Sequence, residues 1–315
     1  MKVFILKITL FCALLVLSYL AMVHKLSEGY VDMYYPKFTQ SAKSLIIGLS
    51  RADEGIDPYT LENGLPEEYN GPVVNFASNQ NYFGSVYLDA IKEKLVDTGN
   101  SEKRFFIVTV SPGSFTAPKG FGTKGIEAMD RKTAIGRAND FTSMPNYSYI
   151  MNCYGNGLYN AFIDSYSGGN LTTHTNGWNE VSLESPTFNI TQEVIKDWKR
   201  KNLAYFERRL PKEEVKPYRL EWFGKTLEHL KSKGDVFLVR MPADKEVIEF
   251  ENKNLPTFKT LMDSITHAYQ IPYLDYSIGN KSFGTYDGSH LYSESAKEFS
   301  TILARDMLRH LKNQP

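Results

Sequence analysis

Short apolar runs alternate with longer segments of helical spacing along most of the chain, from about residue 44 onward. Runs of four to six residues rich in Val, Ile, Leu and Phe are typical of strands buried on both faces of a sheet. They predict strands at Ser44–Leu49, Val73–Phe76, Phe105–Val110, Val236–Met241 and Pro272–Tyr276. Apolar residues at helical spacing predict helices at Tyr82–Leu95, Gln192–Arg209, Glu221–Lys233, Leu255–Tyr269 and Ser293–Leu311. This alternation predicts an α/β fold with a parallel sheet of about five strands.

An insertion at about residues 111–215 separates the third and fourth predicted strands. Its first part, residues 111–180, is rich in Gly, Asn, Ser, Thr and Tyr and shows no clear period. A connection of this length in a compact domain is usually functional, such as a lid or a specificity element, unless it contains elements that the pattern does not reveal. We therefore expect a short N-terminal segment, residues 1–25, followed by one enlarged α/β domain, residues 26–315.

The N-terminal segment has the length and composition of a membrane-spanning helix. Residues 8–23 contain no charged side chain, and Val3–Leu6 extend the apolar stretch to about 20 residues, which is the length that crosses a bilayer as a helix. A signal peptide would be cleaved after small residues, and Leu20-Ala21-Met22 does not supply them. We expect an uncleaved signal anchor that contacts the membrane through residues 4–23, and keep a cleaved signal peptide as the alternative.

The charges beside this segment predict its orientation. Lys2 and Lys7 precede the charge-free run, so the positive-inside rule places the N-terminus in the cytoplasm and the domain outside it. Cys12 then lies in the membrane and leaves Cys153 without a partner. An exported domain without disulfides suggests a bacterial cell envelope. The expected location is the bacterial cytoplasmic membrane, with a single span.

Composition excludes several classes of protein and cofactor site. The 315 residues include 36 basic and 36 acidic side chains, so the chain lacks the basic field that a nucleic-acid-binding surface needs. Two cysteines cannot form a disulfide framework or a multi-cysteine zinc site. No histidine spacing of a metal site is present among His174, His229, His267 and His310. No metal and no cofactor is expected.

A serine follows the first predicted strand in the tripeptide Gly48-Leu49-Ser50. Ligands of open parallel sheets bind at the carboxyl ends of the strands, so Ser50 is expected where a nucleophile would be useful. A helix that begins there would offer backbone N–H groups to an oxyanion. The tripeptide alone is also compatible with an ordinary turn serine.

Asp287 and His290 lie three residues apart between the fifth strand and the closing helix. On a tight turn, this spacing lets the carboxylate accept a hydrogen bond from one imidazole nitrogen while the other nitrogen faces outward. A helix-capping Asp beside a surface His would have the same spacing. Because Ser50 and this pair both follow strands, together they predict a serine nucleophile with a histidine base.

On these residues the chain resembles the SGNH/GDSL hydrolase superfamily, over about residues 40–110 and 230–311. The stretch GLSRADEGIDP at 48–58, followed by VVNFASNQ at 73–80, is similar to membrane-anchored SGNH-like proteins of bacterial envelopes. Those include the teichoic-acid D-alanyl transfer protein and polysaccharide O-acetyltransferases. The resemblance implies a flavodoxin-like three-layer sandwich. It also implies acyl transfer or ester hydrolysis through a triad of Ser50, Asp287 and His290.

The chain departs from the family pattern in the oxyanion hole. The family's second motif is a glycine and its third an asparagine, and this chain has neither at the matching positions. Ser78, Asn79 and Ser111 are then the candidate donors. Loss of one such donor typically costs about 10²–10³ in rate. The other serine-hydrolase fold that shares this residue order, the α/β-hydrolase, requires a second glycine where this chain has Ala52.

Three further residues are candidates for substrate binding. Arg51 could bind an anionic group, or pair with Asp53 or Glu54. Arg240 lies within the fourth strand, where a charge needs a partner, and could reach the site. Trp178 could stack on a sugar if exposed, or belong to the core.

The leading hypothesis is an extracytoplasmic, membrane-anchored serine acyl-transfer enzyme that modifies a cell-envelope polysaccharide or polymer. By resemblance, a multi-span membrane O-acyltransferase would be its partner. One alternative is a carbohydrate esterase or deacetylase of the same fold. Another is a catalytically inactive binding or assembly subunit of an envelope polymer system, which the missing oxyanion asparagine favours.

Overall fold

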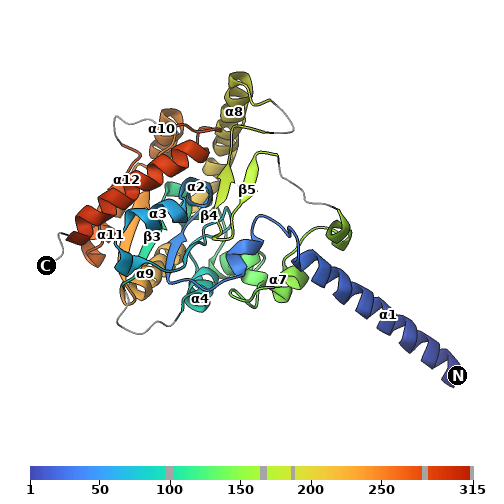
Figure 1. Cartoon of the computed structure of the whole chain (residues 1–315). Coiled ribbons are helices and arrows are strands. Elements are labelled where there is room, and N and C mark those ends of the chain that lie inside the picture. Colours follow the sequence, from blue (N-terminus) through green and yellow to red (C-terminus); the bar gives the residue numbers. More distant parts are fainter. Residues whose placement is uncertain (97–102, 164–168, 186–188, 279–282, 313–315) are drawn as a thin grey trace.

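The computed structural model describes residues 1–96, 103–163, 169–185, 189–278 and 283–312 (Figure 1). A five-stranded parallel sheet forms the centre of the domain. Its strands lie in the order β2 (Val73–Asn75), β1 (Ser44–Ile47), β3 (Phe105–Thr109), β8 (Asp235–Arg240) and β9 (Tyr273–Asp275). Numbered along the chain within this sheet, the order is 2-1-3-4-5, which is the flavodoxin-like arrangement. All five strands that the apolar runs predict are confirmed, and each ends one or two residues before its run does.

Helices cover both faces of the sheet and make the predicted three-layer sandwich (Figure 1). Successive side chains of a strand point to opposite faces, so Leu45 and Ile46 belong to different cores. The face of Leu45 is covered by α4 (Ser85–Lys94), α9 (Pro217–Lys231) and α11 (Phe258–Tyr269). The face of Ile46 is covered by α2 (Ser50–Gly55), α3 (Pro58–Gly64) and α12 (Ser293–Lys312). The apolar pattern did not predict α2, α3, η2 (Glu67–Tyr69) or α10 (Lys245–Asn254).

The segment that follows β3 is built of short elements rather than of one long loop. Its helices are η3 (Pro112–Phe115), α5 (Thr123–Asp130), α6 (Ala134–Arg137), α7 (Tyr147–Asn152), η4 (Leu158–Phe162), α8 (Gln192–Arg209) and η5 (Leu210–Lys212). Its strands form two antiparallel pairs, β4 (Thr116–Pro118) with β7 (Glu213–Val215), and β5 (Leu171–Thr173) with β6 (Asn179–Val181). Of these elements, the apolar pattern predicted α8 alone.

The N-terminal helix α1 (Lys2–Ser27) projects from the domain (Figure 1). Among the described residues, it is the one helix long and apolar enough to cross a membrane, with a mean hydropathy of 2.4. A signal sequence would have the same length and composition. Its side chains are exposed as far as Leu20, whereas Val23 and Leu26 are buried in the same core as Leu45 of the sheet. The last turns of α1 are therefore part of the domain.

The chain just after α1 is tied to the helix that carries Ser50. Lys37 in η1 (Tyr35–Phe38) is 1% exposed, and its Nζ donates to Asp53 Oδ1 of α2 at 2.7 Å and to the Asn75 carbonyl at 3.1 Å. A charge buried this deeply is tolerated only with a partner. Asp53 is thus the partner of Lys37, and the expectation that Asp53 would pair with Arg51 is wrong.

Candidate active site

Close approach of two strands sets the turn that presents Ser50. Gly48 has a φ of +140°, and a Cβ atom there would lie 1.9 Å from Thr109 Oγ1 of the neighbouring strand β3. Only glycine fits this contact and this backbone conformation. The chain then turns directly from β1 into α2, so that Ser50 is the first helical residue. The N–H groups of Ala52 and Asp53 donate to the Leu49 carbonyl at 3.0 and 3.2 Å, which leaves those of Ser50 and Arg51 without an acceptor in the helix.

Ser50, His290 and Asp287 form a continuous chain of hydrogen bonds. His290 Nε2 lies 2.7 Å from Ser50 Oγ, and His290 Nδ1 lies 2.7 Å from Asp287 Oδ2. The other carboxylate oxygen of Asp287 accepts from the backbone N–H of Ser289 at 2.9 Å and of His290 at 2.8 Å. Because an ionised carboxylate only accepts, Nδ1 carries a proton, and in the neutral imidazole Nε2 is left to accept from the serine hydroxyl. This is the geometry of a nucleophile, a base and an orienting acid.

A second carboxylate, that of Glu54, lies in the same site. The Tyr286 hydroxyl donates to Glu54 Oε2 at 2.6 Å, and the Tyr286 ring stacks on His290 with centroids 5.9 Å apart and an interplanar angle of 22°. From the sequence, Glu54 was a candidate only for an ion pair with Arg51, which pairs with Glu251 instead. A usable signal was present, because Glu54 follows Ser50 by four residues on one helix and therefore shares its face.

The charges of this cluster set the protonation of His290. Burial by itself lowers the pKa of His290, but the charges of Glu54 and Asp287, together with the Asp287 hydrogen bond, outweigh it and raise that pKa to about 9. Burial raises the pKa of Glu54 to about 7, against the opposing effects of His290 and of the Tyr286 hydroxyl. Burial also opposes ionisation of Asp287, yet the charge and hydrogen bonds of His290 hold its pKa below the ordinary value. The site therefore favours a protonated imidazole between two carboxylates.

A cavity of about 430 Å³ opens beside Ser50 and His290. The end of β3 forms one wall, through Thr109, Val110 and Ser111. Another part of the lining comes from the insertion, where α8 contributes Asn202, Tyr205, Phe206 and Arg209. Arg209 is held in place, since its Nε donates to Glu213 Oε1 at 2.6 Å and its Nη1 to the Tyr205 hydroxyl at 3.0 Å. The insertion thus shapes the space in which a substrate would lie.

The three predicted oxyanion donors differ in their availability. The Ser78 N–H donates to the Gly48 carbonyl at 3.2 Å and Ser78 is not a cavity residue, so it is not a free donor. Ser111 lines the cavity, but its N–H donates to Ser114 Oγ at 3.0 Å. Asn79 also lines the cavity; its Oδ1 accepts from the Tyr34 hydroxyl at 2.9 Å, which leaves the amide nitrogen as a donor. The Asn79 amide and the first turn of α2 remain as sources of N–H groups.

Arg51 and Arg240 share one buried acid. Arg51 Nη2 donates to Glu251 Oε1 at 2.8 Å, its Nε donates to Ser289 Oγ at 2.9 Å, and its Nη1 has no partner among the described residues. Arg240 is 3% exposed and donates to Glu251 Oε2 at 3.3 Å. Arg51 lines the cavity, whereas Arg240 does not. The prediction that Arg240 reaches the site is therefore wrong, because its charge is satisfied by α10 inside the domain.

Trp178 lies in the core rather than in the cavity. It is 1% exposed and packs in the same cluster as Ile46 of the sheet, so the expectation of an exposed, sugar-stacking Trp178 is wrong. Its indole Nε1 donates to the Glu54 carbonyl at 2.9 Å. Trp178 therefore acts on the site indirectly, by fixing the end of α2.

Within the part of the chain that the structure describes, no group of three or more His, Cys, Asp or Glu side chains could hold a metal ion.

Comparisons with known proteins add only distant likenesses. No family model matches the chain, and no curated protein matches its sequence. A carbohydrate acetylesterase from Sinorhizobium meliloti is similar in structure, with 8% identity and a TM-score of 0.39 over 85% of this chain and 99% of that chain. The inhibitor-bound aryl esterase of M. smegmatis has 9% identity and a TM-score of 0.36 over 85% of this chain and 99% of its own. Likenesses at this level carry no argument about activity, so any assignment depends on the geometry of the site.

Proposed function

We propose that this protein is an SGNH-type serine enzyme that acts on acyl esters, with Ser50 as the nucleophile, His290 as the base and Asp287 as the residue that orients the base. One observation carries the proposal: two contacts of 2.7 Å connect Asp287, His290 and Ser50 at the edge of a cavity. Residues that are 240 positions apart meet here with the order and atoms that nucleophilic catalysis needs.

The first half of the reaction forms an acyl-enzyme. His290 Nε2 takes the proton of the Ser50 hydroxyl while Ser50 Oγ attacks the carbonyl carbon of the ester. The oxyanion that develops accepts hydrogen bonds from the first turn of α2 and from the Asn79 amide. The intermediate collapses as His290 gives its proton to the leaving alcohol oxygen. Ser50 is left as an ester of the acyl group.

The second half transfers that acyl group to an acceptor. A hydroxyl of the acceptor gives its proton to His290 Nε2 and attacks the acyl carbon, and the proton then returns to Ser50 Oγ. Water in the acceptor position makes the same site an esterase. The wall supplied by α8 supports a transferase, because a long, structured insertion is a means of placing an acceptor other than water.

The finer proposal is an extracytoplasmic enzyme, anchored by α1 in the bacterial cytoplasmic membrane, that acylates a cell-envelope polysaccharide or polymer. The length and apolarity of α1 support the anchor, and the resemblance of residues 48–58 and 73–80 supports the envelope substrate. Arg51 remains the candidate ligand for an anionic acceptor group because it lines the cavity. A multi-span O-acyltransferase that delivers the acyl group is the proposed partner.

Active-site labelling tests the proposal. The full chain in detergent is treated with a fluorophosphonate, and the modified residue is located by mass spectrometry. Modification of Ser50, abolished by Ser50→Ala and unaffected by the matched Ser264→Ala on α11, is the expected result. Modification elsewhere, or full ester turnover by the Ser50→Ala variant, would overturn the mechanism. Absence of both modification and ester turnover in the wild-type chain would leave a binding or assembly subunit as the better account.

The response to an added acceptor distinguishes a transferase from an esterase. A transferase turns over p-nitrophenyl acetate slowly and accelerates when an oligosaccharide acceptor is added, with the acyl group recovered on the sugar. An esterase turns over the same ester rapidly, and added sugar has no effect on the rate.

A further inference from the structure

A long stretch without charge lies outside the sheet and beside α1. From Phe141 to Ile163, 23 residues contain no Asp, Glu, Lys or Arg, although such residues make up 23% of the chain. The stretch carries α7 and η4, and both helices pack against α1. The catalytic proposal does not use any part of it.

The helix η4 has one face in the core and one face in solvent. Leu158 and Ala161 pack against the core cluster that contains Val23 and Leu26 of α1. Tyr159 and Phe162 on the other face are 67% and 71% exposed, and Ile163, just after the helix, is 57% exposed. A monomeric protein in water seldom leaves neighbouring apolar side chains this exposed without a partner.

The helix α7, which also packs against α1, exposes apolar side chains as well. Tyr149 and Ile150 are buried, whereas Met151 and Tyr147 are 48% and 39% exposed, and the nearby Met144 is 70% exposed. The Tyr147 hydroxyl lies 2.8 Å from His24 Nδ1 in the last turns of α1.

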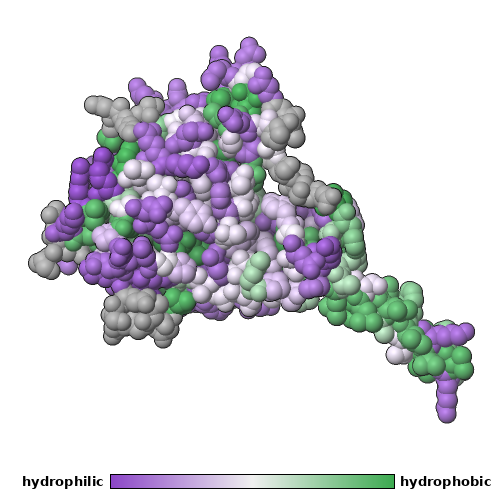
Figure 2. Space-filling view, viewed as in Figure 1, coloured by the Kyte–Doolittle hydropathy of each residue, from purple (hydrophilic) through white to green (hydrophobic). Residues whose placement is uncertain are grey.

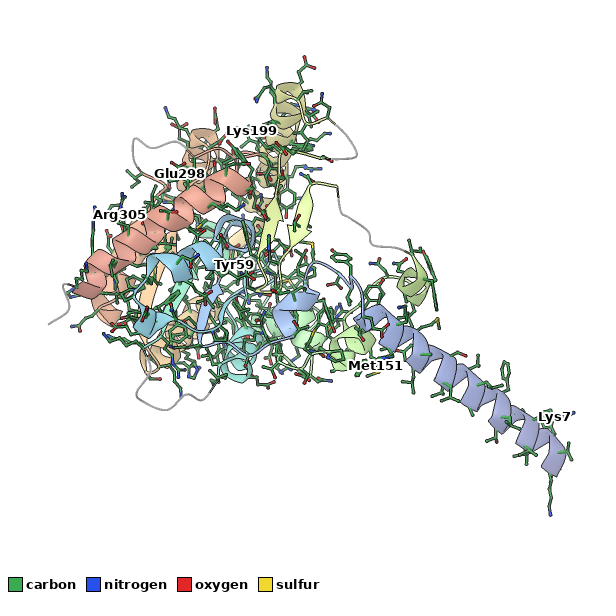
Figure 3. All side chains as sticks on the ribbon, in the orientation of Figure 1. Lys7, Tyr59, Met151, Lys199, Glu298 and Arg305 are labelled. Carbon is green, nitrogen blue, oxygen red and sulfur yellow. The ribbon has the colours of Figure 1, made fainter. Side chains whose placement is uncertain are left out.

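We call the exposed apolar residues of α7, η4 and their neighbours the collar: Met144, Tyr147, Met151, Tyr159, Phe162 and Ile163. Figure 2 shows the hydrophobic colour of α1 continuing onto the adjoining part of the domain, and Figure 3 places Met151 near the domain end of α1, with Lys7 near the other end.

The position of the collar follows from how α1 enters the domain. Val23 and Leu26 are each 2% exposed, so no free linker separates the apolar span from the core. The buried Lys37–Asp53 pair then fixes the next segment to α2. A bilayer that contains the exposed part of α1 must end close to the point where α7 and η4 pack against that helix.

We propose that the collar inserts into the headgroup boundary of the same bilayer that α1 spans, so that the domain is held in one orientation on the membrane. The inference rests on the membrane anchor of the proposed function. Tyr, Phe, Met and Ile without charges are the residues that favour this boundary, where an aromatic ring can bury its body and keep a polar end in water. The domain would then be attached to the membrane by a surface as well as by α1.

A fluorophore at the collar tests this directly. Each variant of the full chain carries a single cysteine, which is labelled with an environment-sensitive dye. The collar variant combines Phe162→Cys with Cys12→Ser and Cys153→Ser. Reconstitution uses vesicles of phosphatidylcholine and phosphatidylglycerol with or without nitroxide-bearing lipid. The matched control is Lys245→Cys on α10, where the native side chain is 84% exposed. Native Cys12, with Cys153→Ser, reports on the span itself.

The expected result is that dye at position 162 loses most of its emission to headgroup-boundary nitroxide and is shielded from iodide, whereas dye at position 245 is quenched by iodide alone. Dye at Cys12 should be quenched by nitroxide deep in the acyl chains. A second variant, Tyr159→Cys, repeats the measurement at a site of similar exposure if Phe162→Cys does not fold. Fluorophosphonate modification of Ser50 checks that each labelled chain is folded.

The failures can be told apart. If Cys12 is not quenched by lipid, α1 does not span the bilayer and the anchor of the proposed function fails. If Cys12 is quenched but position 162 behaves like position 245, only the collar inference is overturned. Shielding of position 162 from iodide without lipid quenching would also overturn it, since a protein surface would then cover the collar. None of these results bears on Ser50, which the labelling experiment tests separately.

Discussion

The sheet and the insertion contribute to the same cavity in different ways. The sheet region supplies the hydrogen-bonded groups, with Ser50 after β1 and the Asp287–His290 pair after β9. The insertion supplies a wall through α8 and keeps its shape by two short antiparallel pairs and buried polar contacts. One such contact joins Arg219, which is fully buried on α9, to Asp130 of α5 at 2.6 and 2.8 Å. The difference indicates that packing of the helices on the sheet positions the catalytic side chains, whereas specific polar contacts maintain the shape of the cavity.

The largest effect should come from the orienting acid of the sheet region. In Asp287→Asn, the oxygen still accepts from the backbone N–H groups, so the amide nitrogen faces His290 Nδ1. The imidazole must then carry its proton on Nε2, where it cannot accept from Ser50. We expect ester turnover to fall about 10⁴-fold with an unchanged unfolding curve. The control is Asp263→Asn, an exposed acid of α11. Activity near the wild-type level would contradict the role of Asp287.

The next effect tests whether the insertion folds with the sheet. Asp130→Ala leaves the Arg219 guanidinium buried without its acid, which should lower the free energy of unfolding by about 3–5 kcal/mol. Urea unfolding should show one transition at lower denaturant. The matched control is Glu127→Ala, one turn earlier on α5, whose pair with Arg131 is at the surface and should contribute little to the free energy of unfolding. Two separate transitions, or equal effects of the two variants, would show that the insertion is an independent unit.

A smaller effect concerns the second carboxylate of the site. Glu54 has a pKa of about 7, so it is ionised over the range in which His290, with a pKa of about 9, loses its proton. Glu54→Gln removes a charge that favours protonated His290 and therefore lowers the His290 pKa. Since the base must be neutral to act, the rising limb of the kcat/KM profile should move to lower pH, by about one unit or 1.4 kcal/mol. The exposed Glu207→Gln on α8 should leave the limb in place. A shift to higher pH would contradict the electrostatic role of Glu54.

The smallest effect should come from the wall of the cavity. Phe206→Ala on α8 removes apolar contact without touching Ser50 or His290. We expect KM for a bulky aryl or acyl ester to rise by about five-fold, or about 1 kcal/mol, with little change in kcat and little change for p-nitrophenyl acetate. Steady-state kinetics on the two esters provide the measurement. If kcat falls to the level of Asp287→Asn, the insertion takes part in the reaction itself. That result would contradict the assignment of catalysis to the sheet region alone.

The parts of the site that sequence could predict are those with local signals. Asp287 and His290 are three residues apart on one turn, so their contact needs no knowledge of the fold. Ser50 was predicted from its place after a strand, a position that parallel sheets share. Trp178 and Arg240 had no comparable signal, because burial and ion-pair partners depend on which distant segments pack against them. Trp178 is covered by the core, and Arg240 is paired with Glu251 of a helix that the apolar pattern did not reveal.

The sequence by itself determined the five strands, most of the covering helices, the apolar helix α1 and the Asp287–His290 turn. Each of these can be predicted from the spacing of nearby residues, because the side chains on one face of a strand or helix recur at a fixed interval in the sequence. Only the tertiary structure decided that His290 meets Ser50, that α8 lines the cavity, that Lys37 joins the segment after α1 to α2, and that Glu54 lies beside the imidazole. These contacts join segments far apart in the chain, or depend on burial that such segments create, and a local period carries no information about which segments those will be.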